Sequence, residues 1–137
     1  MSLTDKQRQL VSASFAQLVP VTKEATSVFY NHLWSIAPET KTMFHLEDIE
    51  QQGIKLMQTL GIAVRAIHDL NTIGPFLYDL GQRHITYGVS KDQYNLVKSA
   101  LLTMIEHCLG GDFTPEVREA WDVTYNIITD LTLTAYD

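Results

Sequence analysis

One histidine, His84, occurs on an apolar helix face. Phe76, Leu80 and His84 recur at intervals of four residues in the helix expected over about 73–85, so they form one stripe. Burying an imidazole costs free energy unless its nitrogens are satisfied, and at this helix end one N–H can donate to the carbonyl of Leu80. The other nitrogen would then be free to bind a metal. The alternative interpretation is a core histidine satisfied by a neighbouring group.

Two other polar side chains, Tyr30 and Gln52, also interrupt apolar helix faces. Either residue alone has an ordinary explanation: a core tyrosine with its hydroxyl at the surface, and an amide at the edge of a helix face. Together with His84 they come from three different helices. The combination favours one shared pocket.

The pattern around His84 excludes several kinds of site. It has no second histidine or carboxylate at metal-ligand spacing, and the chain contains no His-Glu-x-x-His motif, Gly-rich phosphate loop or glycine-flanked serine. A single axial nitrogen implies a metal whose other ligands belong to a cofactor. Haem is that case.

Helical periodicity runs through almost the whole chain, which predicts an all-α fold. The first helix starts at a Thr4/Gln7 capping box and ends before Pro20, and the last starts at Thr114-Pro115. Between them we expect helices over about 21–36, 48–69, 73–85 and 91–109.

Glycines and prolines add detail to this arrangement. Gly53 and Gly61 lie inside a helix, where they predict close crossing by other helices. Pro38 ends a helix and leaves Phe44 in a short corner, and Pro75 is expected near a helix start, where its missing N–H does little harm.

Length and composition predict one domain over residues 1–137. The chain is 45% hydrophobic and 19% charged, with a net charge of −6. This acidic balance argues against nucleic-acid binding, and the absence of an apolar run of roughly 20 residues argues against a membrane span, so a cytoplasmic location is expected. The single cysteine, Cys108, is expected to be a buried thiol.

The chain resembles the globins, in particular flavohaemoglobins and bacterial single-domain haemoglobins. The resemblance covers about residues 4 to 135 and implies a globin fold of six to eight helices around a haem pocket. It is carried, in order, by VFYNHLW, PETKTMF, EQQGIKLMQTLG, RHITYGV, DQYNLV and EAWDVTY.

This resemblance implies roles for particular residues around haem b. His84 would be the proximal iron ligand, Tyr30 and Gln52 the distal hydrogen-bonding pair, and Leu56 the apolar wall beside the ligand. Gln52 could instead ligate ferric iron itself. The full set implied at the cofactor is Phe44, which stacks on the porphyrin, with Gln52, Lys55, Leu56, Leu80, Arg83, His84 and Tyr94.

Charge alone makes Lys55 and Arg83 candidate partners of the haem propionates. Either could equally be a solvated helix residue, since a surface ion pair contributes little free energy.

Two departures from the flavohaemoglobin pattern limit the resemblance. The flavin and nicotinamide domains are not in this sequence, so turnover would need a separate reductase. The family glutamate that strengthens electron donation by the proximal histidine aligns with Tyr136, next to Asp137, although Tyr94 of the same network is present. A less anionic imidazole favours stable ligand binding over oxidative chemistry.

The sequence therefore predicts a globin that binds dioxygen with high affinity, and also nitric oxide and carbon monoxide. Oxygen transport or nitric oxide detoxification, by conversion to nitrate with external electrons, would be its role. A haem-based gas sensor or signalling module is the alternative. A haem-free helical protein is disfavoured, because such a protein has no physical need for His84.

Overall fold

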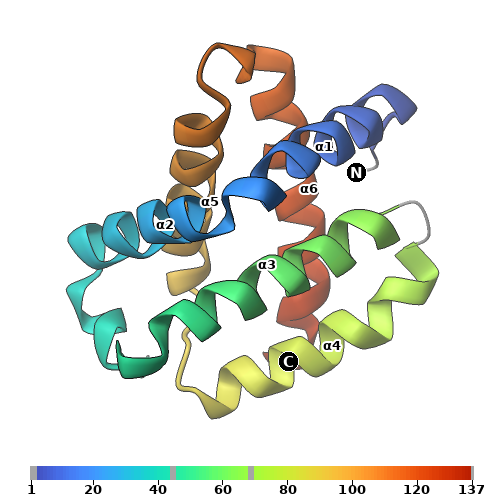
Figure 1. Ribbon diagram of the computed structural model, residues 1–137. Coiled ribbons are helices and arrows are strands. Elements are labelled where there is room, and N and C mark those ends of the chain that lie inside the picture. The colour runs from blue at the N-terminus through green and yellow to red at the C-terminus, as the bar shows by residue number, and fades with distance from the viewer. Residues whose placement is uncertain (1–2, 44–45, 68–69, 137) are drawn as a thin grey trace.

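Six α-helices account for most of the computed structural model, which describes residues 3–43, 46–67 and 70–136 (Figure 1). Short 3₁₀ turns connect the helices, and one of them, η5 (Thr134–Tyr136), follows the last helix. The helices are α1 (Asp5–Leu18), α2 (Thr22–Ile36), α3 (Ile49–Ala66), α4 (Leu70–Thr86), α5 (Gln93–Leu109) and α6 (Pro115–Leu133). The all-α prediction is confirmed.

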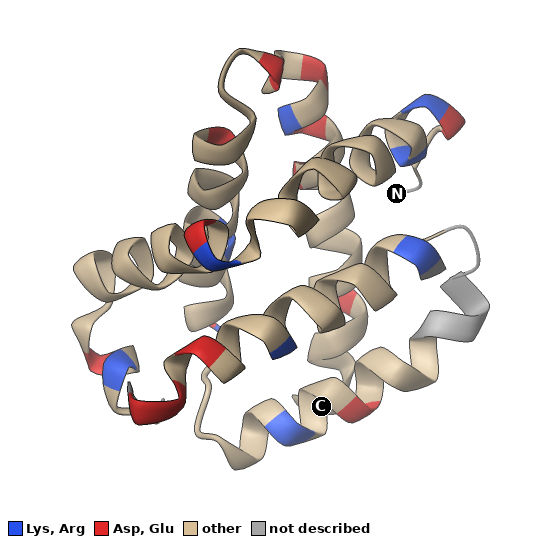
Figure 2. Cartoon of the chain, in the orientation of Figure 1, with Lys and Arg blue, Asp and Glu red and all other residues tan. Residues whose placement is uncertain are grey.

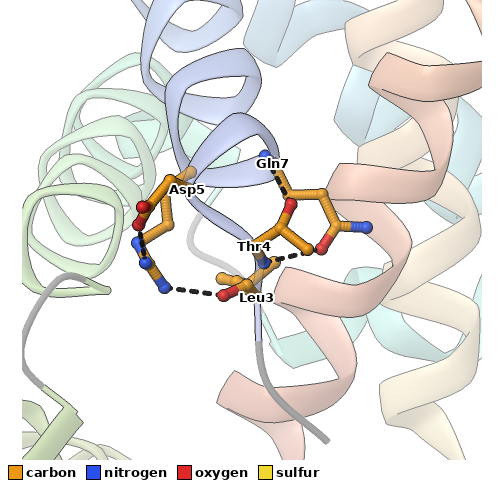
Figure 3. Close-up of polar contacts among 5 residues, drawn as sticks. Leu3, Thr4, Asp5 and Gln7 are labelled. Carbon is orange, nitrogen blue, oxygen red and sulfur yellow. Dashed lines mark hydrogen bonds and ion pairs between the residues drawn. The ribbon is translucent and has the colours of Figure 1, made fainter.

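The first helix begins at the predicted capping box (Figure 3). The Thr4 hydroxyl accepts the backbone N–H of Gln7 at 3.0 Å, and the Gln7 side chain accepts the N–H of Thr4 at 3.0 Å. Arg8 pairs with Asp5 and also donates to the Leu3 carbonyl at 2.7 Å. The two capping-box bonds satisfy backbone N–H groups that the helix itself leaves without partners.

Two sets of crossings build the core. Helix α2 crosses α5, and α6 packs against α1 and against α4 (Figure 1). Trp121 of α6 is 1% exposed, and its indole N–H donates to the buried Ser14 hydroxyl of α1 at 2.8 Å. The indole is thus buried without losing its hydrogen bond.

The predicted close crossings at Gly53 and Gly61 are confirmed. A Cβ at Gly53 would lie 2.7 Å from the Thr26 hydroxyl oxygen and 2.9 Å from the Thr26 Cβ, so α2 crosses α3 at this point with no room for a side chain. At Gly61 the neighbour is the Phe15 ring, 3.3 Å from the same hypothetical atom.

Helix α4 differs from its prediction in two ways. It begins at Leu70 rather than near residue 73, so Pro75 lies in the interior and removes one intrahelical hydrogen bond. Among its residues from 74 to 86, Leu77 and Gly81 are the buried positions, while His84 and the rest of its predicted stripe are half-buried. The buried face is rotated because Leu77 packs in a small cluster with Ala63 of α3 and because Gly81 meets α6.

The distribution of charged residues and the exposure of Cys108 can be compared with the predictions from the sequence. Basic and acidic positions are interspersed over the helices, with acidic residues at the start of α3, where they suit the helix dipole (Figure 2). Cys108 is half-buried rather than buried, because it packs at the edge of the core; burial, with the Glu24 carboxylate nearby, raises the pKa of its thiol. None of the helices in the described ranges is long and apolar enough to span a bilayer.

Candidate functional site

The hydrogen bond predicted for His84 is present. Nδ1 of the imidazole lies 2.8 Å from the carbonyl oxygen of Leu80, one turn earlier on α4. A carbonyl oxygen only accepts hydrogen bonds, so Nδ1 carries the proton and Nε2 of the neutral ring carries a lone pair. That is the tautomer required of a metal ligand.

The electrostatic environment of His84 also favours the neutral ring. Burial lowers the pKa of the imidazole, and the adjacent Arg83 guanidinium lowers it further, while the bond to the Leu80 carbonyl acts in the opposite direction. Nε2 therefore remains free to bind a metal at pH values somewhat below the ordinary histidine pKa.

Helices α3 and α4 run antiparallel and bring two of the predicted side chains to the same end of the pair (Figure 1). The helices meet where Ala63 packs with Leu77, close to the connection between them. Gln52 lies near the far end of α3, and His84 near the corresponding end of α4. Leu56 and Leu80 are half-buried on these helices.

The third polar side chain of the predicted site, Tyr30, comes from α2. Tyr30 is 6% exposed, and its ring packs against those of Phe29 and Trp34 at centroid distances of 5.2 and 5.5 Å. Burial raises the pKa of its hydroxyl to about 12, so the group keeps its proton throughout the physiological range.

The crossing of α2 and α3 at Gly53 brings the helix positions of Tyr30 and Gln52 close together. Thr26, the residue that Gly53 touches, lies one turn before Tyr30 on α2, and Gln52 immediately precedes Gly53 on α3. Close contact between the two helices therefore holds the tyrosine and the amide near one crossing point. This is the helix pair from which we expect the distal groups.

Tyrosines surround the other side of His84. The ring of Tyr94, 7% exposed at the start of α5, has its centroid 5.9 Å from that of His84. Its hydroxyl donates to that of Tyr136 at 3.2 Å, and Tyr136 donates to the carbonyl of Val89 at 2.7 Å. Burial, aided by the hydrogen bond with Tyr136, raises the pKa of Tyr94, so the Tyr94 hydroxyl keeps its proton at neutral pH.

The remaining predicted residues have simpler surroundings. Lys55 is exposed on α3, and Arg83 is half-exposed and lies 3.6 Å from Asp79 on the same helix. Such an exposed pair constrains Arg83 little, so its guanidinium can turn to another anion. Phe44, the predicted stacking residue, lies outside the described residues.

Three residues beside the proximal network were not predicted. The Tyr87 ring lies 6.0 Å from that of His84, and Tyr125 donates to the Tyr94 carbonyl at 2.6 Å. Gly81 lets α4 approach α6, since a Cβ there would lie 2.2 Å from the carbonyl oxygen of Thr132. The signal used for Gly53, a glycine inside a helix, would also have identified Gly81. Nothing local could have indicated the long-range contact of Tyr125.

The donor set at His84 fits a metal held mainly by a cofactor. Nε2 is a single nitrogen with a lone pair, and across the described ranges no three His, Cys, Asp or Glu residues gather as a metal cluster. A metal at His84 would need its other ligands from a macrocycle, and haem has that form.

The fold and site define a class of all-α protein in which one half-buried imidazole carries its proton on Nδ1 and two uncharged polar side chains lie on two other helices. The particular family follows from comparison with known sequences: the chain belongs to the globin family, whose model, described as Globin, matches residues 27–131. Members of this family bind haem and small gaseous ligands.

Similar proteins come from fish and from bacteria. Neuroglobin-2 of Oncorhynchus mykiss and neuroglobin of Danio rerio are each 27% identical to this chain, over 92% of it and 87% of their own length. A bacterial globin from Campylobacter jejuni superposes with a TM-score of 0.84 at 26% identity, covering 98% of this chain and 99% of its own.

A second solved structure is an engineered carbene transferase made from a Rhodothermus marinus protein assigned as a nitric oxide dioxygenase. It has a TM-score of 0.84 at 27% identity, covering 98% of this chain and 94% of its own. The globin resemblance expected from the sequence is thus confirmed.

Proposed function

We propose that this globin holds haem b through Nε2 of His84, binds dioxygen with high affinity, and converts nitric oxide to nitrate when a separate reductase supplies electrons. The observation that carries the proposal is the bond from Nδ1 of His84 to the Leu80 carbonyl, because it leaves Nε2 as the only ring nitrogen with a lone pair. Haem supplies the iron at which a diatomic ligand binds.

Two donors on the distal side explain the proposed affinity. The Tyr30 hydroxyl keeps its proton because burial raises its pKa to about 12, and the Gln52 amide is uncharged at any physiological pH. Both can donate to a ligand that gains partial negative charge on binding, and such bonds are strong in a low-dielectric pocket. Leu56 provides the apolar wall that limits access of water.

The proximal side favours binding over oxidative cleavage. The acceptor that His84 uses is a neutral carbonyl, and within the described residues no carboxylate hydrogen-bonds to the imidazole. Tyr94, whose ring lies near that of His84, donates its hydrogen bond to the Tyr136 hydroxyl and not to the imidazole. Without an anionic partner the imidazole donates fewer electrons to a bound metal.

Chemistry with nitric oxide is supported by the structural likeness to the Rhodothermus marinus protein assigned as a nitric oxide dioxygenase. Sustained turnover needs a supply of electrons to the iron, and the proposed source is a separate reductase. Lys55 and Arg83 are the proposed partners of the haem propionates, since both side chains reach the surface of the two helices that carry Gln52 and His84.

Titration with hemin tests the cofactor. We expect one hemin per chain with a Soret band, and loss of tight binding in His84→Ala. The control is His107→Ala, which removes an exposed imidazole from α5, away from α4. Nε2 of His107 lies 3.2 Å from the Glu24 carboxylate of α2. Absence of a Soret band with excess hemin would refute the haem assignment, and equal binding by His84→Ala would place the ligand elsewhere, for example at His45 or His68, which lie outside the described residues.

Stopped-flow mixing of the dioxygen complex with nitric oxide tests the reaction. We expect rapid formation of nitrate and repeated cycles once a reductant is supplied. A single slow turnover would contradict the dioxygenase activity and favour ligand binding or gas sensing.

A further inference from the structure

The turn η5 contacts the α4 region on both sides of His84. Before the histidine, Gly81 is pressed against the end of α6 and against Ala135, whose Cβ would lie 2.8 Å from a Cβ at Gly81. After it, the Tyr136 hydroxyl donates to the carbonyl of Val89 at 2.7 Å. One short segment far away in the sequence therefore borders the histidine-bearing end of α4 at two points.

Val89 connects that second contact to the backbone of His84. Two residues after the end of α4, Gly88 adopts the left-handed region (φ 86°). The Gly88 N–H donates to the Ile85 carbonyl and the Val89 N–H donates to the His84 carbonyl, both at 3.0 Å. This is a Schellman arrangement. The Val89 N–H thus holds the main chain of His84, while the Val89 carbonyl is held by Tyr136.

A second route reaches the imidazole itself. The Tyr136 hydroxyl accepts from that of Tyr94 at 3.2 Å, and the two rings meet edge to face at 5.8 Å. The Tyr94 ring in turn lies 5.9 Å from that of His84. Tyr136 is therefore linked to His84 in two ways: through Val89 to the His84 backbone, and through the Tyr94 ring to the imidazole.

We propose that Tyr136 is a positioning residue, which fixes the C-terminal end of α4 and with it the orientation of the His84 imidazole. Its hydroxyl makes both bonds at once, one accepted and one donated, so removing it releases the Val89 turn and the Tyr94 ring together. The part of this proposal that concerns haem iron rests on the proposed function. The part that concerns the histidine and its turn does not.

Amide hydrogen exchange on the haem-free protein tests the second part. In Tyr136→Phe we expect exchange at the Val89 and Gly88 amides to accelerate by about fivefold to tenfold, which corresponds to loss of one hydrogen bond. The matched control is Tyr78→Phe, which removes a hydroxyl that accepts from Gln82 on the exposed face of α4. Exchange at Val89 that stays unchanged, or amides throughout the chain that accelerate equally, would overturn the proposal.

The iron–histidine stretching band of the ferrous protein, measured by resonance Raman, tests the first part. Tyr136→Phe is expected to shift or broaden this band because the imidazole samples more orientations, and Tyr94→Phe, which leaves the bond to Val89, is expected to change it less. An unchanged band in Tyr136→Phe would overturn the positioning of the imidazole. Failure of the wild-type protein to bind hemin would refute the proposed function while leaving the exchange experiment valid.

Discussion

The two sides of the candidate site are held in place by different forces. Tyr30 and Gln52 are placed by packing, since their helices cross where Gly53 admits Thr26. His84 is placed by directed hydrogen bonds, one to Leu80 within its helix and others through the turn that follows it. The distal side should therefore respond most to changes of volume, and the proximal side most to loss of hydroxyl groups, except where α4 meets α6.

The close contact of α4 with α6 at Gly81 gives the largest expected effect on stability. In Gly81→Ala the new Cβ would fall 2.2 Å from the Thr132 carbonyl oxygen, so α4 must move away from α6. We expect the free energy of unfolding to fall by about 3 kcal/mol or more, measured in urea.

Gly74→Ala is the matched control for this change, because Gly74 lies on the same helix and its new Cβ would meet no described atom within 4 Å beyond the adjoining residues and backbone of that helix. We expect it to be neutral or to stabilise by about 0.5–1 kcal/mol. Equal effects of the two substitutions would show that α4 does not approach α6 as described.

The distal crossing gives the next largest effect. Gly53→Ala places a Cβ 2.9 Å from that of Thr26, and we expect a loss of about 1–3 kcal/mol in stability together with altered dioxygen release. Thr26→Ala removes two of the three crowding atoms, so the double variant should recover part of the loss in a double-mutant cycle. Strict additivity of the two changes would contradict the crossing.

The sequence predicted the features that depend on neighbours along the chain. The Thr4 cap and the bond between His84 and Leu80 both join residues at most four apart, so residue type and spacing were sufficient. The bond between Tyr136 and Val89 joins residues 47 apart, and no local pattern indicates it.

The placement of α4 shows a related limit. Periodicity identified an apolar stripe through Phe76, Leu80 and His84, but these residues are only half-buried. The buried residues, Leu77 and Gly81, each follow a residue of that stripe by one position. Which face of a helix is buried most is decided by the partner helix, here α6, and not by the composition of the helix alone.

A smaller effect is expected from deleting the distal donors. Tyr30→Phe keeps the ring and its packing while removing the hydroxyl, so dioxygen dissociation should become about tenfold faster for each 1.4 kcal/mol of hydrogen bonding lost. Gln52→Leu should act in the same direction. Unchanged rates in both variants, measured by flash photolysis or stopped flow, would show that neither side chain touches the ligand.

The smallest effect concerns the acidity of His84. Its folded-state pKa is lowered below 6.5, so the unfolded chain binds more protons between the two values and stability falls as the pH drops through 6.5 toward the lowered pKa. Titration of the His84 ring protons by NMR in haem-free protein should give a midpoint below 6.5. A midpoint above that value would mean that the imidazole is stabilised as a cation and poorly suited to bind a metal.

Chemical rescue of His84 tests the central claim most directly. His84→Gly should lose tight hemin binding and the axial-histidine spectrum, and millimolar free imidazole should restore both by supplying the missing ring nitrogen. A His84→Gly protein that keeps the wild-type spectrum without added imidazole would show that the iron is bound by another residue.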